Sequence, residues 1–289
     1  MAALDTVATI EAAPSVATRR RLGIVFWLAL GWIAVVVALA AFADLLPLHN
    51  PAQQALLARR AAPSAAHLLG TDALGRDILA RVIYGARNSL AVGILAPLLA
   101  TLVGGALGLL AGYFRGWLET LTIGATDVLL AFPPLVLALA LTAYLGQSLF
   151  NLIMVLAVLT VPAVTRVARA ATLAVGQREF VIAARALGAS HARILWRELL
   201  PNVMLPLGAY FLILVAVIVV AEAILSFLGL GVPPPAPSWG SMVGEGRDSL
   251  DVAPHIAFIP AAAMFLTVLA FNLVGDTLRA ITDPRHGAT

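Results

Sequence analysis

Long continuous apolar runs dominate this chain, and short polar segments separate them. Six runs are long enough to cross a bilayer, because a spanning helix needs roughly 20 apolar residues. The runs are continuous rather than alternating, which favours helices over the strands of a barrel. They lie at residues 24–46, 89–113, 120–145, 149–170, 204–229 and 256–278. We therefore predict an all-α polytopic membrane protein with six transmembrane helices.

The arginines predict which way these helices run. Placing Arg19, Arg20 and Arg21 in the cytoplasm puts both chain ends and residues 171–203 there too, together with most of the arginines. Several arginines remain outside in the long segment 47–88, which is a weaker determinant of orientation. The inverted orientation is the alternative. A cleavable signal peptide is disfavoured, since the apolar stretch after Arg21 exceeds the roughly 7–15 residues of such a segment.

Residues 171–203 interrupt the apolar pattern with a helical one. Phe180, Ala183, Ala184 and Leu187 recur at helical spacing and predict one apolar stripe. Gly188 ends this helix, and Ser190 is placed to cap a second short helix that runs through residues 194 and 199. Two short helices joined at a glycine favour a docking surface; an amphipathic helix lying on the bilayer is the alternative.

Small residues and prolines mark two of the predicted spans. Ala100, Gly104, Gly108 and Gly112 recur every four residues in the second span, a stripe that allows close helix packing, most simply within the chain. Pro133-Pro134 falls in the middle of the third span, where the loss of backbone hydrogen bonds predicts a kink or an unwound turn. This break is a candidate gate or a purely structural feature.

Three acidic residues fall within or at the edges of the spans. A charge at the bilayer centre costs about 2.5–3.5 kcal/mol, so such residues should face protein or water. Glu222, near the outer end of the fifth span, could meet the cationic end of a passing solute or form an interhelical hydrogen bond. Asp127 and Asp276 lie toward the cytoplasmic ends, where interfacial solvation is expected. With Pro133 and Pro134, these three acids are our pore and gating candidates.

The amino-acid composition argues against several classes of function. With 61% hydrophobic and 11% charged residues, the chain is outside the range of soluble domains. All eighteen basic residues are arginine, so the lysine of a P-loop does not exist here and ATP would bind another chain. The five histidines show no metal-ligand spacing, there is no cysteine, and we predict no metal site. A net charge of +3 does not indicate nucleic acid as a partner.

The interrupting segment resembles a known element, the "EAA" loop of ABC importer permeases. Ala183-Ala184, Gly188 and Leu200-Pro201 fall at the spacing of that loop. The glutamate that names the loop would stand at Ile182, so its contact is absent or is supplied by Glu179 or Arg185.

Further segments resemble the peptide and nickel branch of these permeases, specifically the C-type subunit of dipeptide and oligopeptide systems. The likeness covers roughly residues 65 to 285. The segments are Leu69-Gly70-Thr71-Asp72-Ala73-Leu74-Gly75-Arg76-Asp77 with Tyr84-Gly85-Ala86-Arg87-Asn88-Ser89-Leu90, Ala131-Phe132-Pro133-Pro134, Leu225-Ser226-Phe227-Leu228-Gly229-Leu230-Gly231 with Pro237-Ser238-Trp239-Gly240, and Leu273-Val274-Gly275-Asp276 with Asp283-Pro284.

The resemblance implies the type I ABC importer permease fold in the bacterial plasma (inner) membrane. It implies that this non-catalytic chain forms half of a pore with a second homologous permease. Two P-loop ATPase subunits would bind ATP and Mg, an extracytoplasmic protein would bind substrate, and this chain would bind no cofactor. The implied parts are a cytoplasmic tail 1–23, a first helix 24–46, an extracytoplasmic segment 47–88, a core permease domain 89–279 with coupling loop 171–203, and a cytoplasmic tail 280–289.

The loop would carry ATP-driven movement into the bilayer by inserting its small apolar face into a groove of the ATPase. The coupling residues implied are Glu179, Phe180, Ala183, Ala184, Arg185, Leu187, Gly188, Ser190 and Pro201. Pro201 would set the angle into the fifth span.

Peptides are the expected cargo, and the pore of this branch would also fit nickel chelates, haem or other small solutes. An ion-coupled secondary transporter is a rival, since six helices, a proline break and intramembrane acids would serve it too. It would need no docking loop. An intramembrane enzyme is disfavoured because the chain has no HExxH or GxSxG motif.

Overall fold

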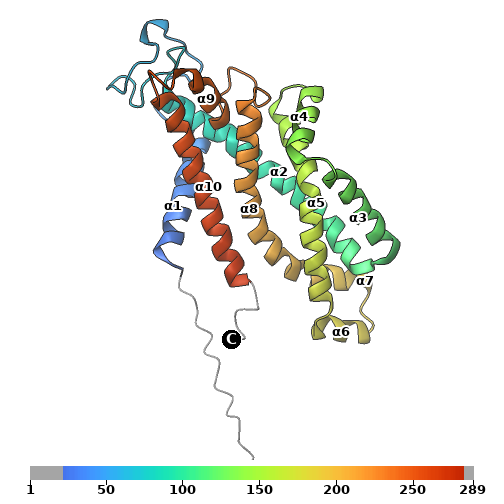
Figure 1. Ribbon diagram of the computed structural model, residues 1–289. Helices are drawn as coiled ribbons and strands as arrows, with labels where there is room; N and C mark the ends of the chain where they lie inside the picture. The colour runs from blue at the N-terminus through green and yellow to red at the C-terminus, as the bar shows by residue number, and fades with distance from the viewer. Residues whose placement is uncertain (1–21, 283–289) are drawn as a thin grey trace, which may run out of the picture.

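The computed structural model describes residues 22–282, which form a bundle of helices (Figure 1). Within that range the only β-pairing is an isolated bridge between Thr71 and Asp77. The helices are α1 (Ile24–Ala41), η1 (Ala43–Leu45), η2 (Leu56–Ala58), α2 (Ile78–Phe114), α3 (Gly116–Leu130), α4 (Pro134–Leu145), α5 (Leu149–Gly176), α6 (Glu179–Ala186), α7 (His191–Arg193), the π-helix η3 (Ile194–Leu199), α8 (Leu200–Phe227), α9 (Trp239–Gly246), η4 (Arg247–Ser249) and α10 (His255–Thr282). The N-terminal arginines 19–21 and residues 283–285 lie outside the described part.

The predicted all-α membrane fold is confirmed. Within residues 22–282, five helices are long and apolar enough to span a membrane, and a sixth span forms if α3 and α4 count as one. These two helices meet at an angle of 83°. The break falls at Pro133-Pro134, as predicted, because neither proline has an N–H to continue the hydrogen-bond ladder of α3. It is a sharp bend between two helices rather than a kink within one.

Helix α2 is longer than its apolar run, since it begins at Ile78 rather than at residue 89. Its first turns carry polar side chains that find partners within the protein. Arg87 donates from Nη2 to Asp44 Oδ2 at 2.9 Å, and Asn88 donates to the carbonyl of Pro237 at 2.7 Å. Hydropathy alone starts this element too late because paired polar residues interrupt the apolar pattern without breaking the helix.

The second helix predicted within residues 171–203 is not a separate short helix, so that expectation was wrong. The chain is continuously helical from His191 to Phe227, through α7, η3 and α8. Pro201 lies in the first turn of α8 and does not interrupt it. A proline costs little where its missing N–H is not needed, and the wider π-helical turn before it gives the ring room.

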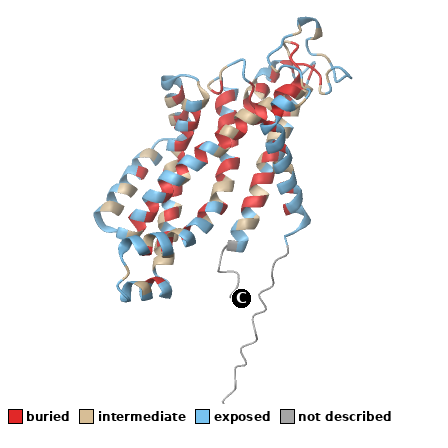
Figure 2. Ribbon diagram, turned by 180° about the vertical axis from the view of Figure 1, so that it is seen from behind, coloured by how far each residue is buried: buried red, intermediate tan, exposed pale blue. Residues whose placement is uncertain are grey.

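Close packing of α2 against α5 holds the centre of the bundle together. A Cβ added at Gly104 would lie 2.8 Å from the carbonyl oxygen of Val161, and one at Gly112 would lie 2.9 Å from Cβ of Thr172. The small-residue stripe therefore serves packing within the chain. Buried residues concentrate along α2, α5, α8 and α10, whereas α3 buries only Thr126 among its residues (Figure 2).

Candidate functional site

Helix α6 and the turn after it form the end of the molecule farthest from α9 (Figure 1). Gly188 has φ +76°, in the left-handed region where L-residues are strained. The Ser190 hydroxyl accepts a hydrogen bond from the N–H of Arg193 at 3.3 Å and so caps α7. The predicted glycine break and serine cap are both confirmed.

This surface has an anchored side and an exposed side. Val181 of α6 is buried against Ile194 and Leu199, which fixes α6 to the helical segment that continues into α8. Of the predicted apolar stripe, Phe180, Ala183 and Leu187 are exposed and Ala184 is half-buried. The exposed fraction is 87% for Leu187 and 70% for Trp196 of η3. We call Phe180, Leu187 and Trp196 the apolar tip.

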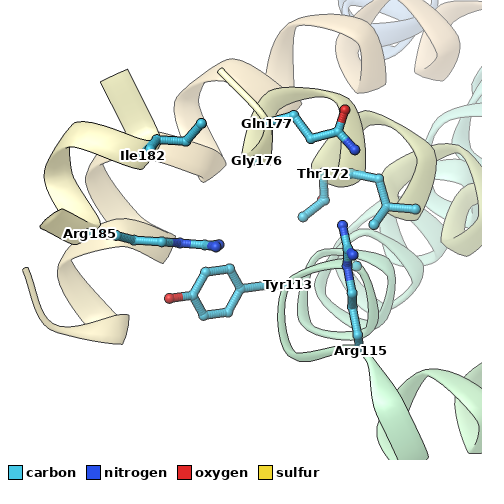
Figure 3. Close-up of a pocket in the computed structure, with 9 residues that line it drawn as sticks. Tyr113, Arg115, Thr172, Gly176, Gln177, Ile182 and Arg185 are labelled. Carbon is cyan, nitrogen blue, oxygen red and sulfur yellow. The ribbon is translucent and has the colours of Figure 1, made fainter. Parts of the chain in front are cut away.

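Next to the apolar tip lies a cavity of about 370 Å³ between α6 and the ends of α2 and α5 (Figure 3). Arg185 projects from α6 with its guanidinium carbon 5.2 Å from the centroid of the Tyr113 ring. The Tyr113 hydroxyl is 2.7 Å from Nδ1 of His191, which ties α2 to α7. Ile182 and Arg115 line the same cavity. Its described lining carries two arginines and no carboxylate.

The α2–α3 turn that supplies Arg115 is strained. Arg115 has φ +54° and ψ −157°, a conformation that residues other than glycine rarely adopt. Gly116 follows at φ +61°. Sequence reasoning missed Tyr113 and Arg115, and their place next to a glycine at the end of an apolar run was the available signal.

The predicted pore and gating residues do not form one site. Asp127 of α3 is exposed and accepts from Arg166 of α5 at 2.6 Å, and a similar pair joins Glu119 to Arg169. Asp276 is exposed near the end of α10. Pro133 and Pro134 are exposed at the bend. The two acid–arginine pairs bind α3 to α5.

Glu222 is buried in a hydrogen-bond network of serine hydroxyls at the α9 end of the bundle. The Ser226 hydroxyl donates to its Oε1 at 2.5 Å and the Ser89 hydroxyl donates to its Oε2 at 3.0 Å. Ser238 donates to Ser226, and the N–H of Trp239 donates to Ser89, each at 3.2 Å. These bonds join α2, α8 and the segment before α9, which favours the interhelical alternative for Glu222. The hydroxyls in otherwise apolar helices were the missed signal.

A second polar group lies nearby, which we call the ionic cluster: the buried Asp72, Arg76 and Arg81 together with the exposed Glu245. Arg76 donates from Nε to Asp72 Oδ2 at 2.6 Å. Arg81, only 1% exposed, lies with Nε 3.4 Å from Asp72 Oδ2 and donates from Nη2 to Glu245 Oε2 at 2.9 Å. Arg76 also donates to Glu245. The cluster joins the start of α2 to α9.

Two of the five histidines, which show no metal-ligand spacing in the sequence, meet in the fold, and the prediction of no metal site stays a prediction. His49 and His67 are 18 positions apart in sequence, and their ring centroids lie 5.0 Å apart in the fold. Asp77 faces both. Folding of the loop between α1 and α2 brings them together, and no short-range spacing in the sequence could indicate it.

Comparison with known proteins gives three findings. Residues 104–287 match the family described as "Binding-protein-dependent transport system inner membrane component". The glutathione transport system permease protein GsiD of Pectobacterium atrosepticum is 44% identical over 223 residues, covering 77% of this chain and 74% of that protein. GsiD of Escherichia coli O1:K1 is 46% identical over 223 residues, which again cover 77% of this chain and 74% of that protein.

The third finding is structural. A chain from a structure titled as inward-facing conformations of the MetNI methionine ABC transporter matches with a TM-score of 0.58 at 19% identity. The match covers 71% of this chain and 96% of that chain. At this identity the likeness concerns the fold.

Proposed function

Because this chain belongs to the family of inner membrane components of binding-protein-dependent transport systems, we propose that it is one of two permease subunits of an ATP-driven importer for small peptides. It is an ABC importer permease of the peptide branch and a multi-pass inner membrane protein. The proposal adds how it is coupled, what it assembles with and what it carries.

The apolar tip is the observation that carries the coupling part of the proposal. Leu187 and Trp196 leave most of their side-chain surface exposed. Large exposed apolar side chains at the centre of a patch are typical anchors of a binding interface. We place this patch in a groove of a separate ATPase. Val181 holds α6 to the helical segment that continues into α8, so displacement of the tip reaches a membrane span.

The cavity beside the tip supports a docking role with a defined charge. Arg115 and Arg185 line it with no carboxylate in its described wall, so an acidic side chain of the ATPase fits there. Ile182 occupies the position of the loop glutamate in related permeases and lines the same cavity. We infer that the partner supplies the missing carboxylate. Glu179 and Arg185 were the expected substitutes within this chain, but Glu179 does not line the cavity and Arg185 carries no carboxylate.

The rest of the complex follows from what this chain lacks and exposes. It has no lysine and therefore no P-loop, so another chain would bind ATP. The resemblance to ABC importer permeases implies two partner ATPase subunits that bind ATP and Mg, and this chain would bind no cofactor of its own for transport. The little-buried helix α3 offers a membrane face to a second homologous permease or to lipid. A substrate-binding protein would dock at the α9 end, outside the membrane, with both chain termini in the cytoplasm.

The proposed cargo is a short peptide of the glutathione class. The relatives at 44–46% identity are named glutathione transport permeases. The carboxylate of Glu222 is fully engaged by serine hydroxyls, so it does not select the cargo in this conformation. We assign selection to the binding protein. Nickel chelates or haem remain the alternative cargo of this branch.

Copurification tests the assembly. The tagged chain is extracted from its native membrane in mild detergent, and every protein that copurifies is identified by mass spectrometry. We expect a second permease and P-loop ATPases. Repeated recovery of the chain alone would contradict the proposal and favour an ion-coupled carrier.

Uptake in the reconstituted complex tests coupling and cargo. Ala184→Trp and Gly188→Trp should abolish ATP-dependent uptake of labelled glutathione while the proteins still insert and assemble with the second permease. Gly31→Trp is the matched control, because a Cβ added there meets nothing within 4 Å and Gly31 lies on α1, away from α6. Wild-type uptake by both α6-loop variants would refute the coupling assignment. Uptake of haem or nickel chelates in place of glutathione would refute the cargo.

A further inference from the structure

The loop between α1 and α2 gathers two imidazoles and a carboxylate at the α9 end of the molecule. We propose that His49, His67 and Asp77 form a binding site for a divalent transition-metal ion of the Zn²⁺ class. The site is far from α6 and involves none of the residues placed in coupling (Figure 1). It is separate from the transport role proposed above, and neither depends on the other.

The ligand atoms already stand close to metal-binding separations. Nδ1 of His67 lies 2.9 Å and Nδ1 of His49 lies 3.7 Å from Oδ2 of Asp77. One ligand atom from each residue lies within 4.8 Å of the other two. Two ligands of a tetrahedral Zn²⁺ at 2.0–2.1 Å are separated by about 3.3 Å, a value between the two distances to Asp77. Small side-chain shifts therefore complete the geometry.

A hydrogen bond to Oδ1 holds the Asp77 carboxylate in place, which leaves Oδ2 for the metal. Oδ1 accepts the N–H of Ala80 at 2.8 Å and caps α2, while Oδ2 faces the two histidines. The carboxylate is 5% exposed, so its orientation is fixed by burial and by the helix cap. A ligand held by such an outer contact binds metal more tightly than a freely rotating one.

The donor set selects the class of ion. Neutral imidazole suits Zn²⁺, Co²⁺, Ni²⁺ and Cu²⁺, whereas Ca²⁺ and Mg²⁺ prefer oxygen ligands alone. Two histidines and one carboxylate make three protein ligands and leave a fourth position for water, as in open zinc sites. The side chain of His49 is 56% exposed, which gives the ion a path from solvent.

The ion would cross-link the long loop between α1 and α2. His49 follows η1 and α1, His67 lies in the middle of the loop, and Asp77 begins α2. One ion would therefore fix three points of a segment that otherwise depends on few packed side chains. Closing a loop of this kind restricts the unfolded chain and stabilises the folded one. We expect the occupied site to stiffen the surface that faces the extracytoplasmic side.

Metal titration of the isolated full-length chain tests the site without any partner. The chain is purified in lipid nanodiscs through a tag free of histidine and is stripped with EDTA. Co²⁺ should bind saturably at one ion per chain, give the visible absorption of a four-coordinate ion, and be displaced by Zn²⁺. Excess Mg²⁺ should not displace it. Absence of saturable binding, or displacement by Mg²⁺, would overturn the proposal.

Matched variants locate the binding. His49→Ala and Asp77→Asn should each weaken Co²⁺ binding by at least about 100-fold, since even outer contacts of metal ligands contribute 10–100-fold. Asparagine caps helices as well as aspartate does, so Asp77→Asn keeps the start of α2. His191→Ala removes a histidine at the opposite end and should bind like the wild type. Wild-type affinity in His49→Ala, whose side chain is largely exposed, would place the ion elsewhere.

Discussion

At the α9 end of the bundle, charged side chains are buried and paired; at the α6 end, apolar side chains are exposed. In the ionic cluster and around Glu222, charged groups pair with partners from three elements of the same chain, and Nε and Nη1 of the buried Arg81 are left without a hydrogen bond. The apolar tip does the reverse, since Phe180, Leu187 and Trp196 leave hydrophobic area in contact with solvent. The α9 end holds charges inside the chain, and the α6 end carries the surface proposed to dock a partner.

The difference separates the parts that set stability from the parts that set assembly. Removing a partner from a buried ion pair costs much, whereas changing an exposed side chain costs the fold little. Substitutions at the α9 end should therefore act on unfolding and those at the α6 end on association. Four experiments test this division, in order of decreasing expected effect.

The largest effect is expected at Asp72. Asp72→Asn leaves Arg76 and Arg81 buried with one carboxylate instead of two, and should lower the free energy of unfolding by about 3–5 kcal/mol. The measurement is the thermal unfolding midpoint in nanodiscs. Asp248→Asn is the control, because that exposed pair with Arg247 should contribute at most about 1 kcal/mol. Equal midpoints for the two variants would contradict the division.

The next effect concerns binding rather than folding. Leu187→Ser should weaken the affinity for the copurified ATPase by about 30-fold, the equivalent of about 2 kcal/mol for a central apolar anchor. Unfolding should shift by less than about 0.5 kcal/mol. Leu57→Ser removes a leucine that is even more exposed, in the loop at the α9 end, and should leave this affinity unchanged. The same loss of ATPase affinity in both variants would show that the apolar tip has no special role.

A smaller effect is expected from the backbone of the α6–α7 turn. Gly188→Ala places a Cβ in the left-handed region and should lower local stability by about 1 kcal/mol, which speeds amide exchange in α6 by about 5-fold. Asparagine tolerates this conformation better, so Gly188→Asn should change exchange less. An added Cβ meets nothing within 4 Å, so sterics inside the chain do not enter. Identical exchange in all three proteins would remove the conformational argument.

The smallest effect is the pH dependence of an exposed pair. The Arg87 hydrogen bond, together with one from Tyr84, lowers the pKa of Asp44 below its usual value. A lowered pKa in the folded state means that the contribution is present above about pH 4 and is lost as pH falls through the folded pKa. The unfolding midpoints of the wild type and Asp44→Asn should differ slightly at neutral pH and converge in acid. A difference between the two unfolding midpoints that grows as the pH falls would contradict the predicted direction of the pH dependence.

Local signals in the sequence were sufficient for much of the fold. The continuous apolar runs indicated the spans because a helix satisfies its own backbone inside a bilayer, whereas the strands of a barrel would alternate in polarity. Gly188 and Ser190 were predictable because a left-handed turn and a helix cap depend on a few neighbouring residues. The bend at Pro133-Pro134 was predictable in place and not in angle, since the packing of α4 against α5 sets the angle.

Features that depend on distant contacts were not predictable. The early start of α2 depends on partners such as Asp44 and Pro237, which are remote in sequence. The continuous helix through Pro201 depends on a π-helical turn that no propensity indicates. The coupling residues stay predictions, whereas the meeting of His49, His67 and Asp77 is a product of the folded loop alone.

The exposed apolar tip also has a consequence for biogenesis. If the apolar tip docks an ATPase as proposed, a newly inserted copy of the chain carries Phe180, Leu187 and Trp196 uncovered until that ATPase binds. Such a surface is what chaperones and quality-control proteases recognise, and it promotes aggregation when subunits are in excess. An orphan subunit should thus be short-lived in the cell, so that the abundance of the ATPase limits how much of this membrane protein accumulates.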